Sequence, residues 1–239
     1  MPDNINMKLA VLIDADNAQA AVCTELLAEV AKFGIASVKR AYGDWTTTYL
    51  KGWKTHLHKH AIQPIQQFSY TKGKNSSDSS LIIDAMDLLH EGSLDGFCLV
   101  SSDSDFTRLA TRLRESGLVV YGFGEEKTPE PFITACDKFI FTENLRKQGG
   151  NKNKEQSANE ALKLIISDAI NAVSKDDGWA ALSGVGGYIT KNNPSFDPRN
   201  YEYDKLGKLV KSLNYLEFSS RTFNDNSSNT HIYIRIKDM

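Results

Sequence analysis

The stretch LAVLIDADN at residues 9–17 decides how this chain folds. Its apolar run has no interruption before Asp14, which is typical of a strand that is buried on both faces of a parallel sheet. A second run of this kind, GFCLVSSDSD at residues 96–105, also ends in closely spaced aspartates. The two runs predict two strands of one parallel sheet, each with acidic residues after its carboxyl end.

Strand-like and helix-like segments alternate on either side of these two runs. Further strands are predicted at residues 36–42, 62–68, 118–123 and 138–141. Segments with helical periodicity lie between the strands, at residues 18–33, 45–60, 79–90 and 106–116. Pro64 places its strand toward an edge, because proline has no N–H to donate to a neighbouring strand. The alternation predicts an α/β fold, an open parallel sheet with helices on both faces.

The pattern changes at residues 146–159, RKQGGNKNKEQSAN, which are polar and typical of a linker. Three helical segments are predicted after it, at residues 160–173, 179–190 and 203–213, followed by strands at residues 216–220 and 231–237. Three short helices closed by a β-hairpin outline a winged helix-turn-helix. We therefore predict a first domain at residues 1–145, a linker at residues 146–159 and a second domain at residues 160–239.

Composition narrows the class of protein. The chain has 239 residues, of which 41% are hydrophobic and 24% charged, as in an ordinary globular protein. No apolar stretch is long enough to cross a bilayer and no signal peptide is recognisable, so we expect a cytoplasmic protein without a membrane partner. The net charge of −2 means that nucleic acid would have to bind to local patches. The 3 cysteines show no CxxC spacing and are expected to be reduced core thiols.

The positions of the aspartates point to a binding site. Asp14 and Asp16 follow the first strand, and Asp103 and Asp105 follow the strand at residues 96–100. In open α/β sheets ligands bind outside the carboxyl ends of the strands, where the strand order reverses. With the order 3-2-1-4-5 these two strands are neighbours, and their carboxylates meet in one crevice. Asp78 begins a helical segment, where it either caps the helix or reaches the same crevice.

Several carboxylates without histidine or cysteine beside them suit Mg²⁺ or Mn²⁺. Such a site supports phosphodiester hydrolysis by a metal-activated water. A single aspartate after a strand is ordinarily a cap or a turn residue, but two pairs and a helix-start aspartate together favour the metal site. Asp84 is about 240° of helical rotation from Asp78, so the two do not share one face of the helix.

Three motifs resemble the NYN domain, a branch of the PIN-like nuclease superfamily. They are IDADN at residues 13–17, KNSSDSSLIIDAMD at residues 74–87 and LVSSDSDF at residues 99–106. The resemblance implies a Rossmann-like nuclease that binds Mg²⁺ or Mn²⁺ and cleaves RNA. The acidic positions of the family fall on four residues of this chain, Asp14, Asp78, Asp103 and Asp105.

Two further residues match positions of the family motifs, and two residues depart from them. Asn17 falls on the asparagine of the first motif, and Asp84 matches a further recurring acid. Ser102 stands where the third motif usually has glycine, and Ser77 precedes Asp78 where an apolar residue is common. Neither departure removes a carboxylate, so the implied activity stands.

The second domain resembles the OST-HTH domain, also called LOTUS, which implies RNA binding. The segments that carry the resemblance lie at residues 178–218 and 232–237. Lys205, Lys208 and Lys211 repeat every three residues on one predicted helix and suit a phosphate-binding stripe, although a solvated helix face is the more common role of such lysines.

Further substrate contacts are assigned near the acidic residues. Lys72 and Lys74 flank Gly73 close to Asp78 and are candidates for phosphate contacts. Asn17 and Ser102 are candidates for orienting water or phosphate. In the cluster HLHKH only His56 and His60 have the i, i+4 spacing of helical metal ligands, so we favour surface or half-buried histidines over a metal site there.

We therefore predict a metal-dependent ribonuclease with an accessory RNA-binding winged-helix domain. Its expected cofactor is Mg²⁺ or Mn²⁺, its partner is RNA, and no nucleotide cofactor is expected. One alternative is a non-catalytic RNA-binding regulatory protein that keeps the acidic crevice only to bind a cation or a partner. Another is a flap-type DNA nuclease with the same site chemistry.

Overall fold

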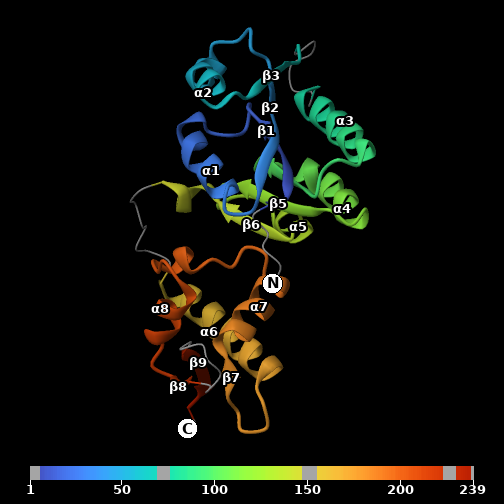
Figure 1. Cartoon of the computed structure of the whole chain (residues 1–239). Helices are drawn as coiled ribbons and strands as arrows, with labels where there is room; N and C mark the ends of the chain where they lie inside the picture. Colours follow the sequence, from blue (N-terminus) through green and yellow to red (C-terminus); the bar gives the residue numbers. More distant parts are fainter. Residues whose placement is uncertain (1–5, 69–75, 147–154, 223–229, 238–239) are drawn as a thin grey trace. The chain divides into compact units, whose positions relative to one another are not determined.

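The computed structural model describes residues 6–68, 76–146, 155–222 and 230–237. The chain divides into two compact units, Met1–Lys147 and Gln148–Met239 (Figure 1). The domain boundaries predicted from the sequence stay a prediction. Each unit is described by itself below.

A six-stranded parallel sheet forms the centre of the N-terminal unit, in the order β3-β2-β1-β4-β5-β6. The strands are β1 Lys8–Asp14, β2 Ile35–Gly43, β3 Gln63–Gln66, β4 Gly96–Val100, β5 Val119–Gly124 and β6 Lys138–Phe141. The predicted α/β class and strand order are confirmed, and β3, which contains Pro64, lies at the edge. Ile13 pairs with Val100, so the residues that follow, Asp14 and Ser101, end neighbouring strands.

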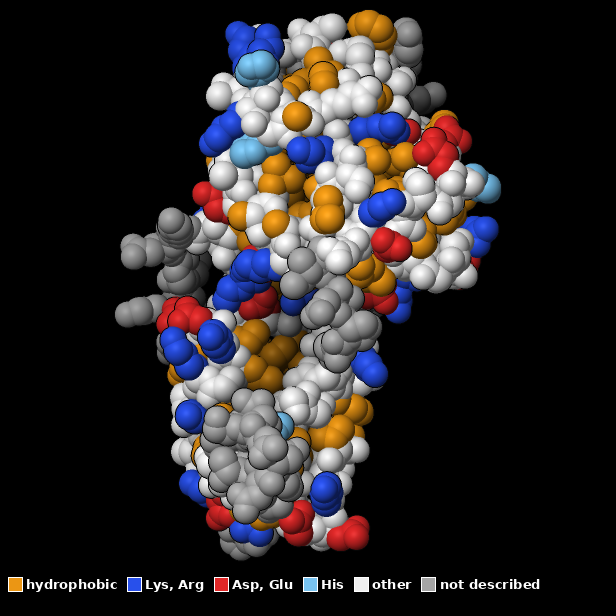
Figure 2. All heavy atoms as spheres, in the orientation of Figure 1, with side chains coloured by type: hydrophobic (Ala, Val, Ile, Leu, Met, Phe, Trp, Pro, Cys, Tyr) orange, Lys and Arg blue, Asp and Glu red, His pale blue; other side chains and the backbone are white. Residues whose placement is uncertain are grey.

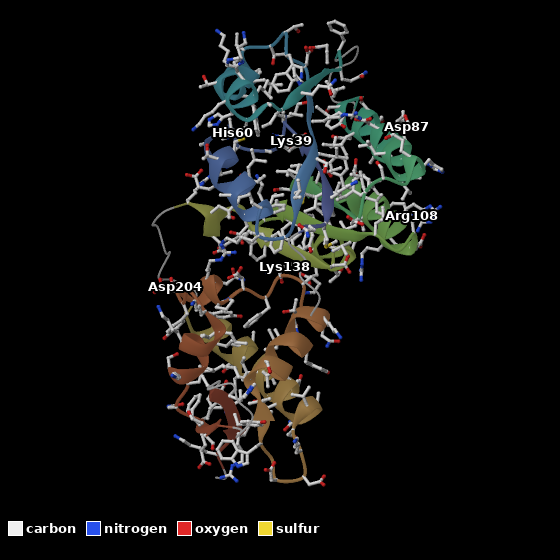
Figure 3. The ribbon with its side chains drawn as sticks, in the orientation of Figure 1. Lys39, His60, Asp87, Arg108, Lys138 and Asp204 are labelled. Carbon is white, nitrogen blue, oxygen red and sulfur yellow. The ribbon has the colours of Figure 1, made fainter. Side chains whose placement is uncertain are left out.

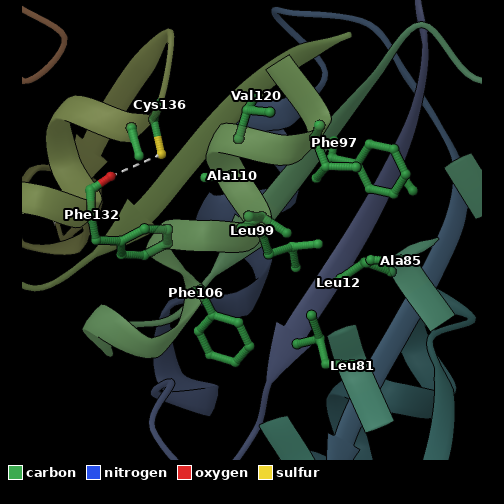
Figure 4. Packing of buried hydrophobic residues seen from close by; sticks show 14 of the residues in the cluster. Leu12, Leu81, Ala85, Phe97, Leu99, Phe106, Ala110, Val120, Phe132 and Cys136 are labelled. Carbon is green, nitrogen blue, oxygen red and sulfur yellow. Dashed lines mark hydrogen bonds between the residues drawn. The ribbon is translucent and has the colours of Figure 1, made fainter. Parts of the chain in front are cut away.

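Helices cover both faces of this sheet, as the alternating segments predict (Figure 1). One face carries α1 Cys23–Val30 and α2 Trp53–His60, and the other carries α3 Ser76–Glu91, α4 Thr107–Glu115 and α5 Glu130–Ala135. Successive residues of β1 serve opposite faces because strand side chains alternate: Val11 packs toward α1, whereas Leu12 packs with Leu81 of α3 (Figure 4). The central strands β1, β4 and β5 are therefore buried on both faces.

The helices differ from the sequence expectation at their ends. The predicted helices at residues 18–33 and 45–60 are shorter in the structure, where 3₁₀ turns at Ala20–Val22 and Tyr49–Gly52 precede α1 and α2. Three consecutive threonines before the second turn are poor helix formers because they are β-branched. The short α5 was not predicted, since its six residues are too few to show a helical period.

In its described residues, the C-terminal unit has three α-helices, a 3₁₀ turn at Pro198–Tyr201 and a three-stranded antiparallel sheet, as expected of a winged helix. Its helices are α6 Glu155–Val173, α7 Leu182–Asn192 and α8 Leu206–Lys211, and its strands are β7 Ala180–Ala181, β8 Leu216–Thr222 and β9 Thr230–Ile236. The sheet order is β7-β9-β8. The described part of α6 begins at Glu155, inside the stretch predicted as a linker, where Glu, Gln and Ala favour helix.

The cysteines are buried thiols, as the sequence predicts. Cys23, Cys98 and Cys136 are buried and form no disulfide. Within the described part of the chain, no helix combines the length and the apolar character that a membrane span requires.

Candidate metal centre

Asp14 is the most constrained carboxylate of the site. It is the last residue of β1 and is 1% exposed. Its Oδ2 accepts hydrogen bonds from Asn17 Nδ2 at 2.8 Å and from Ser101 Oγ at 2.7 Å, and its Oδ1 accepts one from the Asn17 amide at 3.3 Å. Burial raises the pKa of Asp14, and these hydrogen bonds act against the rise. The carboxylate is therefore held in one orientation.

Ser101 connects the ends of the two central strands, and the sequence analysis did not assign it a role. It follows β4 directly and is 2% exposed. Its Oγ donates to Asp14 and accepts a hydrogen bond from the Asp103 amide at 3.1 Å. The only signal in the sequence is a hydroxyl residue placed between a buried strand and the aspartates.

Three carboxylates from two parts of the chain lie close together beyond the strand ends. One oxygen each of Asp78, Asp103 and Asp105 lies within 4.8 Å of the others. Asp78 stands in the first turn of α3 and is buried, whereas Asp103 and Asp105 belong to the turn after β4. Asp103 Oδ1 accepts a hydrogen bond from the Asp105 amide at 2.9 Å, which fixes this turn.

Several other carboxylates make the electrostatic potential at Asp78 strongly negative. Burial is the largest cause that raises the pKa of Asp78 to about 7, followed by the charges of Asp14, Asp103 and Asp105. Asp16 adds a smaller effect, and its own carboxylate is hydrogen-bonded to Ser77 at the start of α3. Hard oxygen donors whose charges raise the pKa of Asp78 in this way fit a divalent cation such as Mg²⁺ or Mn²⁺, which would offset their repulsion.

Asp84 lies in a different network on the same helix. Its carboxylate accepts hydrogen bonds from the Arg40 guanidinium and the Tyr42 hydroxyl, both on β2. The helical phase that separates Asp84 from Asp78 accounts for this placement. Asp84 therefore joins α3 to the sheet and does not belong to the acidic group beside Asp78.

The predicted substrate contacts near the site are engaged with the protein itself or lie outside the described residues. Asn17 holds Asp14, as given above, and is a positioning residue. Ser102 Oγ accepts a hydrogen bond from the Glu125 amide at 2.8 Å, which connects the ends of β4 and β5. Lys72 and Lys74 lie outside the described residues.

The lysines of the C-terminal unit are exposed but do not all stand on one helix. Lys208 and Lys211 belong to α8, whereas Lys205 is the extended residue that precedes it, with φ −145°. The prediction that all three lysines lie on one helix is therefore wrong for Lys205, because α8 begins only at Leu206. Lys208 Nζ pairs with Asp204 Oδ2 at 2.7 Å, and Figure 3 shows Asp204 on this unit.

Comparison with known proteins covers both units. Residues 8–143 match the NYN domain, and residues 154–226 match the OST-HTH/LOTUS domain. No curated protein matches the chain.

Solved structures from three bacteria are similar to parts of the chain. A protein of unknown function from Vibrio parahaemolyticus is 17% identical over 58% of this chain and 94% of its own, with a TM-score of 0.48. Residues 175–257 of a Chromobacterium violaceum protein are 41% identical over 36% of this chain and 85% of that structure, with a TM-score of 0.26. An uncharacterised Nitrosomonas europaea protein is 29% identical over 39% of this chain and 93% of its own, with a TM-score of 0.30.

The two domain matches follow the two units of the structure. The NYN match covers more than half of the chain and includes the whole parallel sheet with its acidic residues. The second match includes the three helices of the C-terminal unit and β8. The chain therefore belongs to the NYN domain family of PIN-like nucleases and carries an OST-HTH/LOTUS domain, a type of domain that binds RNA.

Proposed function

We propose that this protein is a metal-dependent ribonuclease that hydrolyses phosphodiester bonds with a metal-activated water. The observation that carries the proposal is the approach of three carboxylate oxygens, from Asp78, Asp103 and Asp105, to within 4.8 Å of one another. The rise in the pKa of Asp78 supports it, because a cluster of this kind costs free energy unless a cation or a proton neutralises it.

Each acidic residue has a place in this proposal. Asp78, Asp103 and Asp105 would hold Mg²⁺ or Mn²⁺, and Asp14, beside them, would complete the negative site. The bound ion would polarise a phosphoryl oxygen and lower the pKa of an attacking water. Asn17 and Ser101 hold Asp14 through hydrogen bonds and act as positioning residues.

The C-terminal unit would bind the same RNA and raise its concentration at the nuclease site. Lys205, Lys208 and Lys211 are its candidate phosphate contacts, and Lys72, Lys74 and Ser102 are those of the nuclease unit. The proposal includes a cytoplasmic location and domains at residues 1–145 and 160–239. RNA is the proposed partner, and no nucleotide cofactor is part of the proposal.

Cleavage of labelled RNA in Mn²⁺ tests the proposal directly. Wild type should cleave, chelation with EDTA should stop cleavage, and added Mn²⁺ should restore it. Asp78→Asn and Asp103→Asn should lose cleavage while retaining RNA binding. Asp87→Asn is the matched control, since Asp87 is an exposed acid on the same helix as Asp78 (Figure 3) and should cleave as wild type does.

The same assay separates the alternatives. RNA binding by a folded wild type without cleavage in either metal would favour the non-catalytic regulatory protein. A preference for branched DNA over RNA would favour the flap-type nuclease. Cleavage that survives in Asp103→Asn would contradict the proposed site.

A further inference from the structure

A second group of metal-ligand side chains lies on the face of the sheet that α1 and α2 cover. Cys23 Sγ and one ring nitrogen each of His56 and His60 lie within 4.8 Å of one another. The sequence offered only two of these ligands, because Cys23 is far from the histidines along the chain. The fold supplies the third by packing the start of α1 against α2.

The histidines are arranged as ligands rather than as ordinary surface residues. The rings of His56 and His60 are stacked, with 6.2 Å between centroids and 10° between planes. His56 Nδ1 is buried and has no hydrogen-bond partner, a state that is costly for a ring nitrogen. His60 Nε2 lies 3.0 Å from Thr24 Oγ1, and a partner on one ring nitrogen orients metal-ligating histidines in the same way.

Cys23 is the first residue of α1. Burial raises the pKa of its thiol to about 11, and the charge of Glu25 adds to the rise, so the thiol keeps its proton until a metal ion displaces it. Cys23 is only 1% exposed, so a substrate could not reach the sulfur and a role as a nucleophile is excluded. The histidines are half-buried, so their side of the group is partly open to solvent.

The surroundings of α2 distinguish this group from the acidic site. Basic and histidine side chains gather over the part of the N-terminal unit where α2 lies (Figure 2). Lys39 of β2 lies beside His60 and donates a hydrogen bond of 2.5 Å to its backbone carbonyl oxygen (Figure 3). This environment does not suit a hard cation, which needs carboxylate oxygens.

We propose that Cys23, His56 and His60 bind one zinc-class divalent ion through one thiolate sulfur and two imidazole nitrogens. Nitrogen and sulfur donors select Zn²⁺ or Co²⁺ over Mg²⁺ and Mn²⁺. On binding, the Cys23 S–H bond breaks, its proton passes to solvent and a sulfur–metal bond forms. Three protein ligands leave one tetrahedral position for water. The ion joins α1 to α2 and stabilises the nuclease unit.

Co²⁺ is the probe for this site, used with the full chain after removal of bound metal. A sulfur ligand produces a thiolate-to-cobalt charge-transfer band in the near ultraviolet, which a carboxylate site does not. Wild type should develop this band with one equivalent of Co²⁺, and one equivalent of Zn²⁺ should remove it. Absence of the band in folded, reduced wild type overturns the proposal.

Variants assign the band to the three residues. Cys23→Ala should abolish it, and His56→Gln or His60→Gln should weaken Co²⁺ binding by about 10-fold or more. His58→Gln is the matched control, because His58 is exposed on the same helix and lies outside the group. A band that persists in Cys23→Ala, or binding that is equal in His56→Gln and His58→Gln, contradicts the assignment.

Thermal unfolding provides a second measurement that does not depend on Cys23→Ala folding. Zn²⁺ should raise the Tm of wild type and of His58→Gln but not of His56→Gln; an equal rise in all three overturns the proposal. Asp103→Asn should keep the cobalt band, so failure of this site and failure of the nuclease site are distinguishable.

Discussion

At the scale of single residues, Ser101 links two parts of the acidic site without being one of its carboxylates. Its hydroxyl joins Asp14 on β1 to the backbone of Asp103 after β4. A serine in this place keeps both strand ends in register without adding a charge. One small side chain thus contributes to the orientation of Asp14 and to the position of the turn that carries Asp103.

Ser101→Ala should destabilise the protein and weaken metal binding together. It removes one of the two hydrogen bonds that Asp14 Oδ2 accepts and leaves the Asp103 amide without its serine partner, which should cost about 1–3 kcal/mol in the free energy of unfolding. Loss of such an orienting contact should weaken Mn²⁺ binding by about 10–100-fold. Denaturant unfolding and Mn²⁺ titration measure the two effects. The control variant Ser116→Ala, at an exposed serine, should change neither the free energy of unfolding nor the Mn²⁺ affinity. An unaltered Mn²⁺ affinity in Ser101→Ala would contradict the positioning role of Ser101.

Asp78 makes the stability of the metal-free protein depend on pH. Its pKa is raised from 3.8 to about 7, so between these values the folded protein keeps a proton that the unfolded chain has lost. Stability contributed by this group is therefore present at low pH and falls as pH rises from about 4 to about 7, with no further change above.

Asp78→Asn should remove this loss of stability. In EDTA the variant should have a higher Tm than wild type at about pH 8, and the difference should shrink toward pH 4. Mn²⁺ at about pH 8 should raise the Tm of wild type but not of the variant. Asp87→Asn should follow wild type throughout. Parallel Tm curves for wild type and Asp78→Asn would show that the charge of Asp78 is not repelled in the folded protein.

The residues of the site differ in how far the sequence predicts them. The aspartates are visible because each follows a strand or begins a helix, and the opposite phase of Asp84 follows from helical geometry alone. The side chains and backbone groups that contact these residues cannot be recognised in the sequence. That Asn17 and Ser102 contact the protein, and that Cys23 meets His56, depends on the distances between elements, which no local pattern contains.

At the scale of elements, the attachment of α3 to the sheet determines where Asp78 lies. Asp84 joins this helix to β2 through Arg40 and Tyr42, while Leu81 and Ala85 pack on the sheet. On this one helix, Asp84 therefore attaches α3 to the sheet, whereas Asp78 belongs to the acidic site.

Asp84→Asn should lower stability without removing the metal site. It replaces a carboxylate that accepts two hydrogen bonds, one of them charged, which should cost roughly 1–3 kcal/mol in the free energy of unfolding. Mn²⁺ affinity should stay within about 2-fold of wild type, because Asp84 lies outside the acidic group. Denaturant unfolding and Mn²⁺ titration check this, with Asp87→Asn as the control. Loss of Mn²⁺ binding in a folded Asp84→Asn protein would place Asp84 in the site after all.

The burial and the length of a helix or strand explain whether the sequence predicts it. β1 and β4 are continuous apolar runs because both of their faces are covered, so their residues alone are enough to recognise them as strands. α5 and β7 are too short to show a period, and β7 exists only because it pairs with β9. Elements that owe their existence to a partner far along the chain are absent from local patterns.

At the scale of the whole molecule, the two units have separate cores. The buried residues of the sheet lie in two clusters made only of residues before 147, and those of the C-terminal unit lie in a third made only of residues after it. The net charge of −2 gives no general attraction to RNA. In the proposed function, binding of long RNA would therefore come from local contacts on each unit.

Separating the units should reveal how they combine. Fragments of residues 1–147 and 148–239 should each unfold cooperatively, because each keeps its own core. The first fragment should cleave a short RNA with a kcat/KM within about 2-fold of the full chain but a long RNA at least about 10-fold less efficiently, since it has lost the tethered second contact. In the full chain, replacing Lys205, Lys208 and Lys211 by alanine should reproduce part of the loss on long RNA and none on short RNA. If the first fragment cleaves long RNA as efficiently as the full chain, the C-terminal unit does not deliver substrate to the nuclease site.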